Sequence, residues 1–175
     1  MSNPHAEWLE TDGLGGFASG TISGARTRRY HALLLTARRP PTDRMVLVNG
    51  FDAFVDTANG SVALSSQAYL PDVVSPDGAT HIASFARDPW PQWTFALPDG
   101  TRVHQEIVMV HGASAVALAW RLDGPAQHAV LRVRPFLSGR DYHALHHENP
   151  AFRFDPESRG DALVWRAYPD VPTVT

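Results

Sequence analysis

Apolar and polar positions alternate with a period of two along much of this chain. The alternation is clearest at 101–110, 115–122 and 128–135. In the second stretch four large apolar side chains, Trp120 among them, fall on one face. Because successive side chains of a strand point to opposite faces of its sheet, this pattern is typical of half-buried β-strands. We therefore predict three strands here, with Trp120 in the core.

Turn-forming sequences separate the apolar stretches. They offer the glycine and proline positions that tight turns need, at Asn59-Gly60, Pro76-Asp77-Gly78, Pro98-Asp99-Gly100 and Asp123-Gly124-Pro125. The clearest hairpin spans 97–101. No window of a dozen residues carries apolar side chains at the spacing of an amphipathic helix. The chain is predicted to be all-β, a large antiparallel β-sandwich with few short helices.

The tail at 149–175 has a less regular pattern. Residues 152–154 and 163–168 are predicted to be two strands across a turn at 157–161. If related domains are longer than this chain, a strand edge is left unpaired at its end. An unpaired edge would invite formation of a homodimer.

The composition is that of an ordinary globular protein. The 175 residues suit one domain with a sizeable core, since 43% are hydrophobic and 19% are charged. The formal net charge of -3 gives no electrostatic reason to expect nucleic acid, which normally needs a concentrated basic surface.

Several kinds of site and location are excluded or disfavoured. The chain has no cysteine, so it holds no disulfide, no thiolate metal site and no cysteine nucleophile. Its first five residues lack the pattern of a signal peptide, and no apolar run approaches the length of a membrane span. We expect a cytoplasmic protein that binds no membrane, and nothing in the sequence points to a cofactor.

A glycine-rich segment at 7–35 precedes the first strongly apolar run, and it contains five glycines, three acidic residues and three arginines. Glycine loses more backbone freedom on ordering than any other residue, so such a loop is usually shaped for a contact. Residues 13–18 formally fit the dinucleotide-binding pattern. However, a polar segment precedes them and poor helix formers follow, so a phosphate-binding loop is not favoured.

Four sequence motifs carry a resemblance to a known family. They are Glu-Trp-Leu-Glu-Thr-Asp-Gly-Leu-Gly-Gly-Phe-Ala-Ser-Gly-Thr at 7–21, Thr-Arg-Arg-Tyr-His-Ala-Leu-Leu at 27–34, Pro-Gln-Trp-Thr-Phe at 91–95 and Arg-Asp-Tyr-His at 140–143. In these motifs, and in their order and spacing, residues 7–142 resemble the N-terminal domain of bacterial and archaeal type glycogen debranching enzymes, the amylo-alpha-1,6-glucosidase family. Departures are small, with Asp12 where the family often has Asn, Phe17 where Tyr is common and Ala32 where Gly is common.

The resemblance implies an architecture and a division of labour. In the family a supersandwich-like β-domain precedes a barrel of paired helices, and the glycosidic chemistry belongs to the barrel. We therefore expect one β-sandwich domain over 1–175, truncated at its C-terminal end if the family's domain is longer, with the helical catalytic barrel absent. The partners this implies are an α-glucan chain of the glycogen type and the helical catalytic domain of the same enzyme.

Two groups of residues are candidates for binding carbohydrate or for docking a second domain. Flat aromatic rings can cover the apolar face of a sugar, which favours Trp8, Trp90 and Trp93, although such rings also serve as core or interface residues. The second group consists of charged and ring side chains inside the motifs shared with the family: Arg28, Arg29, Tyr30, His31, Arg140, Asp141, Tyr142 and His143.

Strand alternation would place Arg29 and His31 on one face, with Arg28 and Tyr30 on the other. A cation that enters an apolar face needs a partner. These residues therefore either close a strand end through an ion pair, or contact a catalytic domain or glucose hydroxyls. Planar guanidinium groups suit both roles.

Catalytic and metal-binding residues are not assigned. Glycoside hydrolysis needs two carboxyl groups about 5 to 10 Å apart, and no spacing in the sequence selects such a pair. His143, His146 and His147, with Asp141 and Glu148, are of the types that bind zinc or iron in a cupin-like enzyme. They fall in a polar loop, where histidine is more often solvated than bound to a metal.

The leading hypothesis is a non-catalytic N-terminal β-sandwich of a glycogen debranching type enzyme. It would support the helical catalytic domain and help to hold an α-glucan chain. The parent reaction, by resemblance, is hydrolysis of α-1,6-linked glucose at branch points, and this chain alone is expected to be inactive. The alternatives are a stand-alone β-sandwich that self-associates and a metal-dependent cupin-like enzyme.

Overall fold

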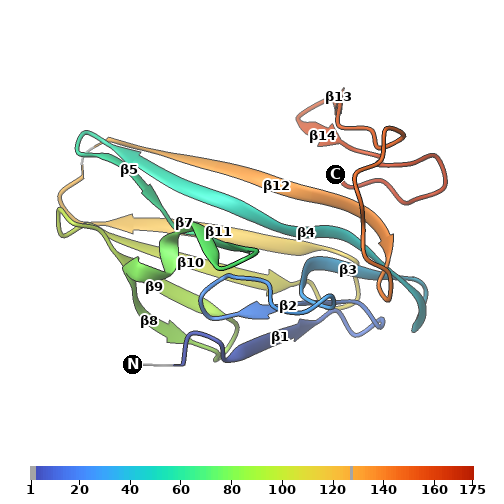
Figure 1. Cartoon of the computed structure of the whole chain (residues 1–175), viewed down its shortest axis with the longest axis horizontal. Coiled ribbons are helices and arrows are strands. Elements are labelled where there is room, and N and C mark those ends of the chain that lie inside the picture. Colours follow the sequence, from blue (N-terminus) through green and yellow to red (C-terminus); the bar gives the residue numbers. More distant parts are fainter. Residues whose placement is uncertain (1–2, 127) are drawn as a thin grey trace.

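The computed structural model describes residues 3–126 and 128–175. In this part of the chain, 14 strands and one short 3₁₀ helix form an all-β fold of antiparallel sheets (Figure 1). The predicted fold class is confirmed.

Two large sheets make up the sandwich. The six-stranded sheet contains β1 (Glu7–Thr11), β2 (Phe17–Thr21), β3 (Ala32–Arg39), β4 (Thr42–Thr57) and β12 (Ala129–Asp141) in that order, with β5 (Gly60–Ala63) also paired to β4. The four-stranded sheet has the order β11 (Val116–Asp123), β10 (Arg102–Met109), β9 (Gln92–Ala96), β8 (Ile82–Ala86). Two further hairpins are β6 (Ser66–Tyr69) with β7 (Val73–Asp77), which the 3₁₀ helix η1 (Gly78–His81) follows, and β13 (Glu157–Arg159) with β14 (Ala162–Val164).

The core lies between the two large sheets. From the six-stranded sheet come Leu33 and Leu47, and from the four-stranded sheet come Phe95 and Val103, all buried. A smaller cluster around Leu35 buries part of the opposite face of the six-stranded sheet. Because neighbouring residues of a strand face opposite ways, β3 and β4 are apolar on both faces where they pair.

The strands predicted from alternation are present. Stretch 101–110 contains β10, 115–122 lies within β11 apart from its first residue, and 128–135 contains the start of a longer β12. The hairpin at 97–101 joins β9 to β10, where the amide of Leu97 donates to the carbonyl of Thr101 at 2.8 Å. Trp120 faces the core from β11 but stays half-buried, because β11 is the last strand of its sheet.

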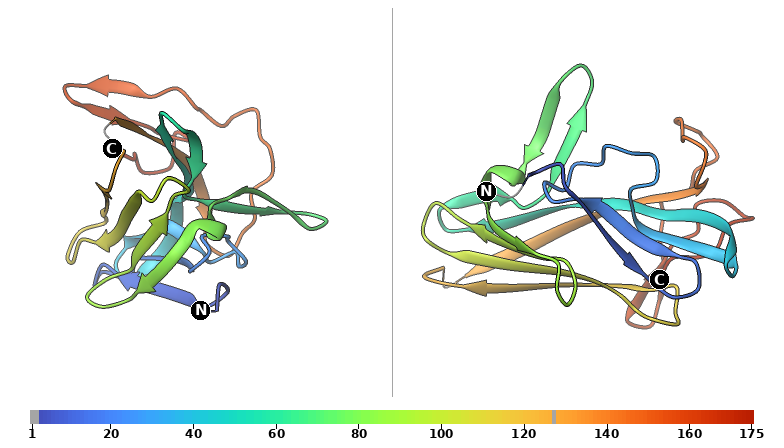
Figure 2. Two further views of the ribbon diagram at one scale, coloured as in Figure 1. Left: turned by 90° about the vertical axis from the view of Figure 1, so that its left-hand side faces the viewer. Right: turned by 90° about the horizontal axis from the view of Figure 1, so that it is seen from below.

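The β6–β7 hairpin projects away from the sandwich (Figure 2). Its tip exposes Tyr69, Leu70 and Val73. After it, the predicted turn at 76–78 is instead the end of β7 and the start of η1. At Gly78 an added Cβ would lie 2.5 Å from the carbonyl carbon of Leu64, so the backbone packs too closely there for any side chain.

Of the two strands predicted in the tail, the one at 152–154 is wrong. The one at 163–168 is present only at its start, where 163–164 belong to β14 and Trp165 pairs with Val174. Residues 152–154 form no strand, and the hairpin is built instead from the short β13 and β14. The amide of Arg153 does donate to the carbonyl of Ala167 at 3.0 Å, so the two segments meet at one point without forming a ladder. The tail lies beyond the end of β12 (Figures 1 and 2).

Candidate functional site

Two segments that lie far apart in the sequence meet on the surface of the sandwich. One is the turn at 28–30, just before β3, and the other is the loop at 141–144 at and beyond the end of β12. The guanidinium of Arg29 donates to the carbonyl of His143 at 2.9 Å. The hydroxyl of Tyr30 lies 3.1 Å from Nδ1 of the same histidine. The structure thus brings together most of the charged and ring residues that the sequence singled out.

Exposed and half-buried rings gather at this meeting point. The rings of Tyr142 and His143 lie 3.8 Å apart, and those of Tyr30 and Tyr142 lie 5.7 Å apart. The side chain of Tyr142 is half-buried and packs against the small cluster around Leu35. We call Arg29, Tyr30, Tyr142 and His143 the Tyr30 surface. It presents aromatic faces, a phenol hydroxyl and a cation to whatever binds there.

Arg140 holds the two segments together. Its side chain is buried, and it donates to the backbone carbonyls of Arg29 (2.6 Å), Ala144 (3.0 Å) and Tyr142 (3.3 Å). Among the described residues no carboxylate forms an ion pair with it. Burial lowers the pKa of Arg140 from its ordinary value, although guanidinium groups stay charged in proteins. Arg140 therefore positions the surface and does not itself face a ligand.

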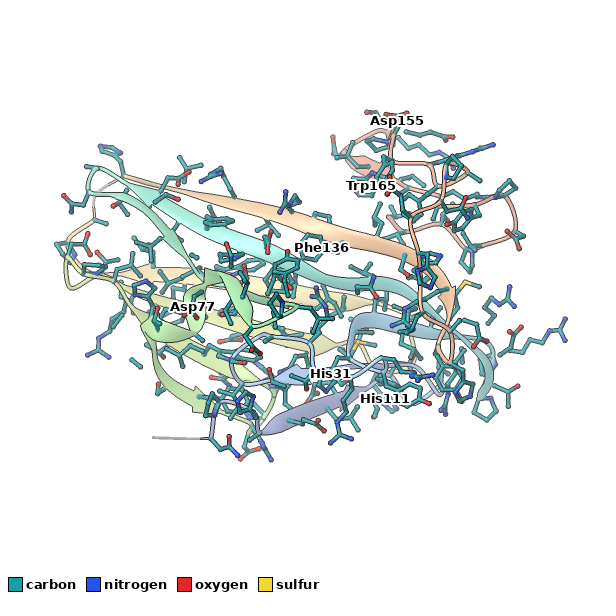
Figure 3. All side chains as sticks on the ribbon, viewed as in Figure 1. His31, Asp77, His111, Phe136, Asp155 and Trp165 are labelled. Atoms are coloured by element: carbon teal, nitrogen blue, oxygen red, sulfur yellow. The ribbon has the colours of Figure 1, made fainter. Side chains whose placement is uncertain are left out.

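A second contact ties the turn to the first strand. Arg28 forms an ion pair with Glu7 of β1 at 2.5 Å. The ring of His31, which is labelled in Figure 3, is buried, and its Nε2 lies 3.4 Å from the same carboxylate. The amide of Thr27 donates to Nδ1 of His31 at 3.2 Å, so the ring hydrogen belongs on Nε2. The pKa of His31 is lowered because burial disfavours the charged ring, which outweighs the attraction of Glu7.

The predicted alternation of 28–31 along a strand is wrong. β3 begins only at Ala32, and the amide of His31 donates to the carbonyl of Arg28 at 3.1 Å, which closes a turn. Arg28 and Arg29 are consequently both exposed, and only His31 points inward. The ion pair at a strand end, one of the two roles considered for these arginines, is present.

The glycine-rich loop is a hairpin turn built around Asp12. Oδ1 of this buried carboxyl accepts from the amides of Leu14 (2.7 Å) and Gly16 (2.9 Å). Gly16 has no room for a side chain, because an added Cβ would lie 2.3 Å from Oδ2 of Asp12. The loop joins two antiparallel strands, with a strand rather than a helix after it, so it lacks the geometry of a phosphate-binding loop.

A family model described as glycogen debranching enzyme N terminal matches residues 6–175. The chain belongs to this family. The match confirms the resemblance and extends it from 7–142 through the tail. No curated protein and no solved structure matches the chain. In the described residues of this debranching-enzyme domain, no helix is long and apolar enough to cross a membrane.

Two of the three tryptophans considered as sugar platforms are part of the domain's core. Trp8 and Trp93 are 8% and 4% exposed, and their rings meet edge to face at 5.6 Å. The cavity beside them has a volume of about 60 Å³, which is room for roughly four water molecules and too little for a sugar ring. Trp90 is half-buried and donates to Glu106 at 2.9 Å. Only Trp90 of the three keeps a partly exposed ring.

The histidine-rich loop of the debranching-enzyme domain does not gather metal ligands. In the described residues no group of three or more His, Asp or Glu side chains is close enough to hold a metal ion. His143 faces Tyr30, whereas Nε2 of His146 lies 3.3 Å from the hydroxyl of Tyr168 in the tail. The histidine side chains described in this loop therefore give no support to the cupin-like alternative.

A groove that the sequence analysis does not predict lies between the tail and the end of the sandwich. This groove, which we call the tail groove, has a volume of about 810 Å³ and is lined by residues that include Asn49, His146, Phe152, Phe154 and Tyr168. The aromatic spacing at 152–154 was the available signal. This spacing predicts a strand, but alternation is typical both of a strand and of two rings that face the same way.

Proposed function

We propose that this chain is a non-catalytic N-terminal domain of a glycogen debranching enzyme, and that it supports the helical catalytic domain by contacting it through the Tyr30 surface. The parent reaction is hydrolysis of α-1,6-glucosidic branch points, carried out by the catalytic domain. A cytoplasmic location remains part of this proposal.

The observation that carries the proposal is that two of the motifs shared with the family meet on one exposed surface. The motifs at 27–34 and 140–143 are separated by more than a hundred residues. Arg140 joins them by donating hydrogen bonds to backbone carbonyls. Apart from a contact of 3.5 Å to Oδ1 of Asn49, the buried Arg140 donates to backbone carbonyls, so it fixes the shape of the surface without doing chemistry on it. Tyrosine and arginine are typical of residues that contribute strongly to protein interfaces, and both are present here.

The proposal makes a direct prediction for the chain itself. Purified protein should not hydrolyse branched α-glucan, and it should bind a helical catalytic domain of the family supplied separately. Replacing Arg29 by Ala should weaken that binding by about ten-fold, because the charged hydrogen bond to the loop is lost. Arg102→Ala is the matched control, since this exposed arginine lies on β10 in the other sheet. Robust hydrolysis by the chain, or equal effects of both variants, contradicts the proposal.

A second candidate is a self-associating β-sandwich, and the edge strand β12 favours it. Val130, Leu131 and Val133 on this strand are 61%, 39% and 39% exposed. The outer edge of β12 pairs with no other described strand. A second copy that added its own β12 would pair the free backbone groups of this edge and place its own side chains beside these three. Light scattering tests this candidate, and a monomer at high concentration counts against it.

A further inference from the structure

The tail groove presents aromatic faces that the fold leaves uncovered. Phe154 is 74% exposed, yet its ring lies 4.7 Å from that of Phe152. Phe152 in turn meets Tyr168 edge to face at 5.5 Å. Exposing a phenylalanine to this extent sacrifices burial of apolar area, so the exposed ring is better explained by a contact than by packing.

The groove is formed before any ligand arrives. The rings of His146 and Tyr168 lie 5.8 Å apart, in addition to the hydrogen bond between them. Tyr168 also packs on Gly139 of β12, where an added Cβ would lie 3.1 Å from Cδ2 of the tyrosine. The backbone pair between Trp165 and Val174 closes the tail on itself. Little ordering is therefore left for a ligand to bring about.

The polar groups of the groove suit an uncharged ligand with many hydroxyls. Asn49 and Asn149 offer amides and Glu148 offers a carboxylate, and none of the described residues that line the groove is Arg or Lys. The pKa of His146 is lowered by burial first, and then by the neighbouring Arg140 and His147, so its ring is neutral at pH 7. An anionic ligand finds no cation here, whereas hydroxyl groups find both donors and acceptors.

We propose that the tail groove binds a stretch of α-glucan chain, with the ring of Phe154 covering the apolar face of a glucose unit and Asn49 bonding its hydroxyls. A volume within the range of about 300–1,000 Å³ that holds drug-sized ligands accommodates a short oligosaccharide. The choice of α-glucan over other sugars rests on the proposed function. The binding site itself rests on the geometry of the groove.

The test is titration of the 175-residue protein with maltoheptaose, followed by calorimetry and by NMR shifts of the aromatic side chains. Saturable binding is expected, with the shifts confined to the tail groove. Phe154→Ala should weaken the binding by about ten-fold, since one face of an aromatic ring is lost. The matched control is Tyr69→Ala, because Tyr69 is 57% exposed and lies on the β6–β7 hairpin outside the groove. Both variants should keep the wild-type melting temperature.

Three results would overturn the proposal. They are the absence of binding up to about 10 mM maltoheptaose, equal effects of Phe154→Ala and Tyr69→Ala, and binding of cellohexaose as tight as that of maltoheptaose. A chain that docks on a catalytic domain but binds no maltoheptaose loses this inference and keeps the proposed function. If Phe154→Ala weakens docking and leaves maltoheptaose binding unchanged, a protein partner covers the groove and the inference is wrong.

Discussion

Replacing Asp12 by alanine should destabilise the domain, because one carboxyl group shapes the whole turn between β1 and β2. Asp12 is fully buried and its Oδ1 accepts hydrogen bonds from the amides of Leu14 and Gly16. Its Oδ2 has no hydrogen-bond partner among the described residues. The substitution removes the acceptor and leaves two amides of the turn without a partner.

The magnitude follows from these contacts. Hydrogen bonds to a charged group contribute about 1.5–3 kcal/mol each, while a buried polar atom without a partner costs about 1–3 kcal/mol. With the middle of each range, losing the two bonds at Oδ1 and relieving the cost at Oδ2 leaves a net loss of about 2.5 kcal/mol in the free energy of unfolding. For a chain of this size the melting temperature should fall by roughly 5–10 °C. Asp12→Asn keeps the acceptor and should stay within about 1 kcal/mol of the wild type.

The assay is urea unfolding followed by tryptophan fluorescence, since Trp8 and Trp93 are both in the core. The midpoint should shift for Asp12→Ala with an unchanged slope, because the same surface is exposed on unfolding. A loss below about 0.5 kcal/mol for the alanine variant would show that the amides find other partners. Equal losses for the alanine and asparagine variants would show that charge, and not the acceptor at Oδ1, holds the turn.

Three other substitutions test the site and the tail. Arg140→Lys should cost about 2–3 kcal/mol, since buried carbonyls lose their donor, and hydrogen exchange should quicken at 141–144; unchanged exchange there contradicts the positioning role. Burial lowers the pKa of His31, so as pH falls below about 6.5 this ring takes up a proton in the unfolded chain before it does so in the folded one. The free energy of unfolding therefore drops. His31→Gln should make this drop shallower in urea unfolding at pH 7 and pH 5, and an unchanged pH dependence counts against it. Gly139→Val should push against Tyr168 and cost about 1–3 kcal/mol; limited proteolysis should then cut the tail faster, and equal cleavage rates refute the close packing.

The strands that sequence patterning predicted well are those with one face in water. β10 alternates along its length because one side faces the core and the other faces solvent. β3 shows no such alternation, since residues 32–37 are buried on both faces. The tail was misjudged because Phe152 and Phe154 face the same way to line a groove, and period-two spacing does not distinguish this from a ladder.

The candidate site was only partly accessible to the sequence. The sequence predicts the residues of the Tyr30 surface as candidates because they lie in motifs shared with a family. Their meeting depends on the pairing of β4 with β12 and on Arg140, and no local pattern encodes either. The inward turn of His31 was missed for a similar reason, since its partner Glu7 comes from a different strand.

The pairing of β12 with β4 also has a consequence for synthesis of the chain. Partners in this ladder are separated by 72 residues at one end (129 minus 57) and 96 at the other (141 minus 45). At about 5–20 residues per second, a ribosome needs roughly 4–19 s to make that length, and β4 has an unpaired edge throughout. Arg140 and Asp141 are the last of these partners to be made, so the Tyr30 surface takes shape only once β12 has paired with β4. A partner that recognises this surface therefore selects chains that have finished folding.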